Sequence, residues 1–126
     1  MVWIDLVSVL AVLQLVFFGI MVGSARAKYG VHAPALTGHP VFERMYRVQM
    51  NTLELLVAFL PALYLASHYW APAWVAAMGS LFLLGRLIYW RAYLNNPASR
   101  TLGFALSAFP VLSLLLATLL GIARAL

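Results

Sequence analysis

The sequence predicts an all-α integral membrane protein in which four helices cross the bilayer and pack as one bundle. Hydrophobic residues make up 65% of the 126 residues and charged residues only 9%, which leaves too little polar surface for a soluble protein. The apolar residues fall into four runs, each close to the ~20 residues that a helix needs to cross the hydrocarbon core. These two observations together define the class.

The four apolar runs follow one another with short polar breaks. They cover residues 6–22, 48–67, 68–86 and 101–123. We interpret the first run as a retained span, because Asp5 precedes it and it exceeds the roughly 7 to 15 residues of a signal-peptide core. The second run contains one charge, Glu54, and the fourth contains none. Residues 1–126 are therefore expected to form a single four-helix membrane domain.

Positive charges mark the side expected to face the cytoplasm, where loops carry an excess of Lys and Arg. They lie in the first and third loops, whereas the short second loop has none. The residues are Arg26, Lys28, Arg44, Arg47, Arg91 and Arg100. Both termini should then lie on the opposite side, and a bacterial protein would reside in the inner or cell membrane. The net charge of +5 is explained by these loops, so no nucleic-acid partner is expected.

The chain offers little for thiol or metal chemistry of its own. It has no cysteine, which removes a thiolate ligand and a cysteine nucleophile together. His32, His39 and His68 are spread over two loops on opposite sides, with no carboxylate at a ligand spacing. We expect solvated loop histidines and no metal site. Any sulfur chemistry would use the sulfur of a ligand.

A polar stripe begins in the first loop and continues into the second apolar run. An ionisable group at membrane depth costs roughly 2.5 to 3.5 kcal/mol on insertion scales, so it usually faces a ligand or another subunit. The stripe consists of Glu43, Arg47, Asn51 and Glu54, which share one face of a helix. Gln49 lies off this face and could serve a second contact or a subunit boundary. The alternative is an interfacial anchor with one buried polar pair.

A matching stripe follows on the third run. It consists of Arg86, Tyr89, Tyr93 and Arg100, which stay on one face if the helix continues through Pro97. Alternatively, Pro97 lies in the first turn of a new helix capped by Asn95 or Asn96, which would move Arg100 relative to the tyrosines. A further alternative makes the aromatic residues an interfacial belt and the arginines cytoplasmic anchors.

Together these residues resemble the MAPEG family, the membrane-associated proteins of eicosanoid and glutathione metabolism. The resemblance rests on the run Phe42-Glu43-Arg44-x-Tyr46-Arg47-x-Gln49-x-Asn51-x-x-Glu54, then Arg86-x-x-Tyr89-x-x-x-Tyr93, then Arg100. The four spans and their loop charges also fit, so the resemblance covers essentially the whole chain.

The MAPEG resemblance implies a homotrimer that binds glutathione in clefts between subunits, open toward the cytoplasm. Carried over by position, the glutathione residues are Arg47, Asn51, Glu54, Tyr89 and Tyr93, with Gln49 from the neighbouring chain and Arg26 reaching a carboxylate. Arg100 resembles the arginine that polarises the glutathione sulfur in the cysteinyl-leukotriene synthases. Leu55 stands where those synthases carry a tyrosine, which argues against leukotriene synthesis. Small residues that permit close helix approach in a trimer are Ala73, Ala77, Ala117 and Gly121.

The implied activity is that of a membrane-bound glutathione transferase with a role in detoxification and, as a second activity, reduction of lipid hydroperoxides. Glutathione would be the co-substrate, and a lipophilic electrophile or lipid would enter from the surrounding membrane lipids. Two alternatives remain. One is a non-catalytic lipid-binding or scaffold member of the same fold, and the other is a small proton-coupled multidrug transporter that uses Glu54.

Overall fold

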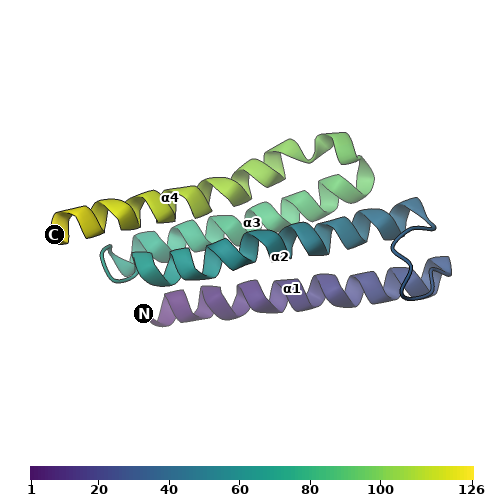
Figure 1. The fold of residues 1–126 in the computed structure, drawn as a ribbon, viewed down its shortest axis with the longest axis horizontal. Coiled ribbons are helices and arrows are strands. Elements are labelled where there is room, and N and C mark those ends of the chain that lie inside the picture. The colour runs from purple at the N-terminus through teal and green to yellow at the C-terminus, as the bar shows by residue number, and fades with distance from the viewer.

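A computed structural model describes all 126 residues as four long helices with no strand (Figure 1). The helices are α1 (Val2–Tyr29), α2 (Pro40–Ala66), α3 (Pro72–Asn95) and α4 (Thr101–Ala125), with a short 3-10 helix, η1 (Pro97–Ser99), before α4. Each long helix has the length and hydropathy needed to cross a membrane. The all-α, four-span prediction is confirmed. Both termini and the second connection lie at one end of the bundle, and the first and third connections lie at the other (Figure 1).

The first connection is closed by local capping on both sides. α1 is capped by Gly30, whose φ of 67° is left-handed and whose backbone N–H donates to the carbonyl of Arg26. α2 begins with Pro40 in its first turn, where a missing N–H costs nothing. His39 caps this helix, because its Nδ1 accepts from the N–H of Val41 at 3.2 Å. Because α2 begins at Pro40, all residues of the second-run polar stripe lie within this helix.

The third connection corrects the prediction of a helix continuing through Pro97. α3 ends at Asn95, and the backbone of Asn96 is extended (φ −153°, ψ 107°), as expected before a proline. The side chain of Asn96 accepts from the N–H of Ala98 at 3.1 Å and caps η1. The alternative with a new helical turn at Pro97 is therefore confirmed. The expected start of the third run was also too early, because α3 begins only at Pro72.

Two buried apolar clusters fill the bundle. In the cluster at the end that holds the termini, the rings of Phe59 and Phe82 stack with centroids 3.9 Å apart. The other cluster joins α1, α2 and α3 near the first connection through Phe18, Phe42 and Tyr89. Because lipid tails are as apolar as these side chains, close packing rather than the hydrophobic effect must hold the helices together.

Glycines bring α3 and α4 into backbone contact. A Cβ added at Gly103 would lie 2.5 Å from the Cα of Tyr89, and one added at Gly85 would lie 2.7 Å from the carbonyl carbon of Leu106. No side chain fits at either position without moving a helix. The first half of α4 is therefore fixed against α3 at the level of Tyr89.

Two of the four small residues expected to permit close approach in a trimer, Ala117 and Gly121, make contacts within the chain near the termini. A Cβ on Gly121 would meet the ring of Tyr69 at 2.6 Å, and the carbonyl of Ala117 accepts from Nε1 of Trp70 at 2.7 Å. These two residues therefore serve contacts within the chain, because the turn after α2 folds back onto α4. Ala73 remains exposed.

Substituting alanine at Gly103 should lower the thermal stability of the protein. Inserting a methyl group against a packed backbone typically costs about 1 to 3 kcal/mol. The matched control is Gly23→Ala, because a Cβ at Gly23 meets nothing within 4 Å and alanine favours a helix. The measurement is the melting temperature of both variants in detergent. Equal melting temperatures for Gly103→Ala and the parent protein would contradict the close approach of α3 and α4.

Candidate functional site

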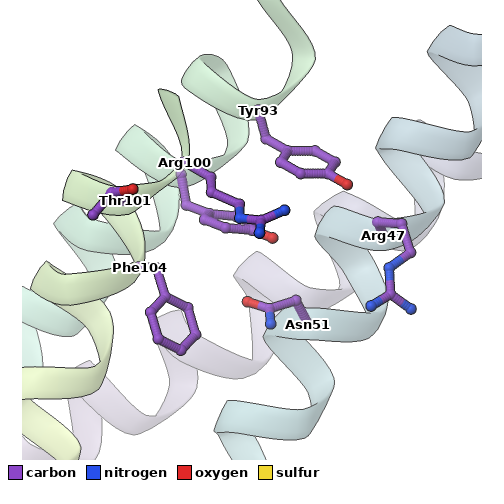
Figure 2. Close-up of a pocket in the computed structure, with 7 residues that line it drawn as sticks. Arg47, Asn51, Tyr93, Arg100, Thr101 and Phe104 are labelled. Atoms are coloured by element: carbon purple, nitrogen blue, oxygen red, sulfur yellow. The ribbon is translucent and has the colours of Figure 1, made fainter. Parts of the chain in front are cut away.

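A polar cavity of about 430 Å³ lies between α2, α3 and α4, near the end of the bundle that holds the first and third connections. The residues that line it are Arg47, Asn51, Tyr89, Tyr93, Arg100, Thr101 and Phe104. Figure 2 shows Tyr93 reaching in from α3 and Arg100 from the start of α4, opposite Arg47 and Asn51 of α2. The fold thus brings residues of both predicted stripes to one place.

The α3 wall of this cavity is aromatic. Tyr89 and Tyr93 lie one turn apart, and their rings are nearly parallel, with centroids 5.4 Å apart. Tyr89 is buried and Tyr93 is half-buried. Because Tyr89 packs inside the bundle and lines a cavity, an interfacial belt does not describe it.

The cavity is electropositive. Both charged residues that line it, Arg47 and Arg100, are arginines with exposed side chains, and no carboxylate lines it. A guanidinium pairs with a carboxylate in a planar, two-pronged arrangement. The arrangement therefore favours an anionic ligand, and Phe104 adds an apolar surface on the α4 side.

Arg86 of α3 lies buried beside the cavity, and its side chain forms hydrogen bonds to α2 and α4. Its Nη1 donates to Oδ1 of Asn51 at 2.7 Å, and its Nε donates to Oγ of Ser107 at 2.8 Å. Its guanidinium carbon lies 4.4 Å from the ring centroid of Tyr89. The sequence placed Arg86 on the third-run stripe but not among the binding residues. The available signal was a charge at membrane depth three residues before Tyr89.

Arg26 is not brought to the cavity of this chain. Its Nη1 donates to the carbonyl of Ala35 at 2.7 Å and to that of Val31 at 3.5 Å. Its guanidinium carbon lies 4.6 Å from the ring centroid of Phe42. Arg26 therefore ties the first loop to the helices that the loop connects.

Glu43 and Glu54 of the second-run stripe, and Gln49 next to it, also lie outside the cavity. Oε2 of Glu43 accepts from the N–H of Gly38 at 3.1 Å, so this carboxylate holds the loop. Glu54 is exposed on α2. Gln49 faces α1, since its Nε2 lies 3.1 Å from where a Cβ on Gly19 would stand. Of the α2 residues expected to bind a ligand, only Arg47 and Asn51 line the cavity.

The histidines do not all behave as expected. His32 and His68 are exposed, in agreement with solvated loop positions. His39 is half-buried, stacks on Tyr29 with ring centroids 3.9 Å apart, and caps α2. Its predicted role as a solvated side chain is wrong, because the short loop folds it back between α1 and α2. No group of three His, Asp or Glu side chains is placed to hold a metal ion.

Comparisons with known proteins identify the family. The four spans and the polar cavity at one end define a multi-pass membrane protein with an interhelical site. The profile of the MAPEG family matches residues 4–120. The chain is 44% identical over 120 residues to an uncharacterized protein of Synechocystis, which covers 95% of this chain and 88% of that protein. The chain belongs to the MAPEG family.

Two further relatives have named activities. Microsomal glutathione S-transferase 2 of Homo sapiens is 37% identical over 118 residues, which covers 94% of this chain and 80% of the human protein. Leukotriene C4 synthase of Bos taurus is 36% identical over 94 residues, which covers 75% of this chain and 63% of the bovine protein. The similarity to the transferase therefore extends over nearly the whole bundle.

Proposed function

We propose that this protein is a membrane-bound glutathione transferase that activates the glutathione thiol against lipophilic electrophiles, with lipid hydroperoxide reduction as a second activity. The observation that carries the proposal is the electropositive cavity. It joins five of the residues that the MAPEG resemblance assigns to glutathione, namely Arg47, Asn51, Tyr89, Tyr93 and Arg100. The named relatives support the same activity.

Glutathione suits the charge of this cavity. The tripeptide has two carboxylates and one ammonium group, and arginine pairs efficiently with a carboxylate. Arg47 is positioned to bind such a carboxylate, and Asn51 supplies an uncharged polar contact beside it. In this proposal, Glu54 receives the ammonium group from its exposed position one turn beyond Asn51.

Arg100 is proposed to activate the sulfur. A cysteine-type thiol has a pKa near 8.5, so only a few per cent is thiolate at neutral pH. A guanidinium beside the sulfur in a partly desolvated site lowers that pKa by about one to three units. The larger thiolate fraction raises the rate by roughly tenfold before orientation contributes. The thiolate then attacks a carbon electrophile, forming a carbon–sulfur bond while a leaving group such as halide departs. With a hydroperoxide, it attacks the outer oxygen and breaks the oxygen–oxygen bond to release an alcohol, and a second glutathione thiol converts the resulting sulfenic acid to the disulfide and water.

A trimer would complete the site. Gln49 and Arg26 do not line the cavity of their own chain, and we propose that they act on the glutathione held by a neighbouring subunit. Arg26 would first have to leave the carbonyl of Ala35. The helix ends that adjoin the first and third connections lie beside the cavity and carry most of the positive charge, so the site is proposed to open toward the cytoplasm.

The second substrate should be apolar. Phe104 lines the cavity, and Leu102 and Phe109 of the same helix are exposed, with Leu106 partly buried between them. These side chains offer only hydrocarbon to an electrophile that reaches the cavity from the bilayer. The transporter alternative is disfavoured, because Arg47 and Arg100 would repel a cationic drug and Glu54 does not line the cavity.

The protein is expected to assemble as a homotrimer. Native mass spectrometry in mild detergent should give about three times the 13.9 kDa of one chain. A monomer or dimer that binds glutathione with full affinity would contradict the proposed sharing of the site between subunits.

Removing either proposed charge contact should weaken glutathione binding. Arg47→Ala and Glu54→Ala should each raise the dissociation constant at least tenfold, about 1.4 kcal/mol, because each loses a charge-assisted pair. Isothermal titration of the intact trimer is the measurement. Arg124→Ala is the matched control, since this exposed arginine lies at the far end of the bundle. Wild-type affinity in both Arg47→Ala and Glu54→Ala would refute the assigned binding roles.

Arg100→Ala should separate chemistry from binding. We expect glutathione affinity to stay within a few fold, while the apparent pKa of the bound thiol rises and turnover of an aryl halide falls by about tenfold or more. The readouts are thiolate absorbance against pH and initial rates. If the variant ionises bound glutathione and turns over like the wild type, Arg100 is only an anchor. A wild type that binds glutathione without turning over any electrophile or hydroperoxide would instead indicate the scaffold alternative.

A further inference from the structure

Arg86 is a buried charge to which the proposed reaction assigns no role. Its side chain is fully buried, although a charge at membrane depth is costly. Every group that it contacts is neutral: the side chains of Asn51, Thr52 and Ser107 accept its hydrogen bonds, and the ring of Tyr89 lies against the guanidinium. Its Nη2 has no partner. Two of the residues that Arg86 contacts, Asn51 and Tyr89, line the cavity, which suggests that this costly charge serves the site.

The bond to Asn51 fixes which end of that amide is free. A guanidinium only donates hydrogen bonds, so it must face the amide oxygen, and Nη1 lies 2.7 Å from Oδ1. The amide NH2 group is then the part of Asn51 left to donate to a ligand in the cavity. Without Arg86 the amide could turn over and present its oxygen, which would repel a carboxylate or carbonyl of the ligand.

The other contacts of Arg86 connect the walls of the cavity. Ser107 accepts from Nε of Arg86 and donates to the carbonyl of Gly103, at 2.8 and 2.7 Å. Gly103 in turn packs on the backbone of Tyr89. One guanidinium therefore links Asn51 of α2, Tyr89 of α3 and Ser107 of α4.

We infer that Arg86 is a positioning residue for glutathione: it holds the Asn51 amide with its NH2 group available to an acceptor on the tripeptide. This inference rests on the proposed function. Arg86 does not line the cavity, and its contacts do not include Arg100, the residue proposed to act on the sulfur. Its effect should therefore appear in binding and not in activation of the thiol.

A double-mutant cycle tests this role. Arg86→Met should weaken glutathione binding by about tenfold, and Asn51→Ala by a similar factor. In the double variant the loss should be no larger than in Asn51→Ala alone, because Arg86 acts through that amide. The apparent pKa of the bound thiol and the turnover at saturating glutathione should stay close to wild type. Arg91→Met is the matched control and should bind normally, since Arg91 is an exposed arginine on the same helix outside the cavity.

A second variant covers the case in which Arg86→Met does not assemble. Ser107→Ala removes one acceptor of Arg86 without changing a cavity residue, and it should weaken binding by a few fold in the wild-type background but not in Asn51→Ala. Losses that add in either cycle, or unchanged affinity in Arg86→Met, would overturn the inference. A wild-type protein that binds no glutathione would refute the proposed function instead, so the two failures are distinguishable.

Discussion

The hydrogen bonds of one buried guanidinium hold together the half of the bundle that contains the cavity. Helices surrounded by lipid gain little from burying apolar side chains, so their association depends on close packing and interhelical polar contacts. Arg86 supplies such contacts to α2 and α4 at once, through Asn51 and Ser107. The glycine contacts between α3 and α4 bring these helices near enough for the bonds to form. The hydrogen bonds of Arg86 and the glycine contacts together fix the positions of the three helices that line the cavity.

The two ends of the bundle are consequently built for different tasks. Toward the termini, Phe59 and Phe82 stack within an entirely apolar cluster. At the other end, polar residues replace part of the packing and leave a space lined by two arginines. The first connection is held there by Arg26 and Glu43, whose side chains bond to its backbone. An anionic ligand would thus meet a preformed wall of α2, α3 and α4.

The sequence predicts the spans and the polar stripes well because both depend on periodicity within one segment. The prediction that a helix continues through Pro97 was wrong. Arg100 nevertheless lines the same cavity as Tyr89 and Tyr93, because η1 turns the chain so that α4 starts beside α3. Helical spacing also places Glu54 with Asn51, but only the structure shows that Glu54 is exposed. The partners of Arg86 and Arg26 could not be read at all, because they come from distant segments or from backbone carbonyls.

The arrangement separates the groups that would bind glutathione from the group that would activate its sulfur. Arg47 and Asn51 stand on a continuous helix, and Asn51 is further fixed by Arg86. Arg100 stands at a junction between η1 and α4, and its exposed side chain makes no hydrogen bond within the chain. A cation that is already neutralised by a neighbouring carboxylate would stabilise a thiolate weakly. An unpaired Arg100 beside a rigid binding wall would therefore keep its charge available for the sulfur in the proposed reaction.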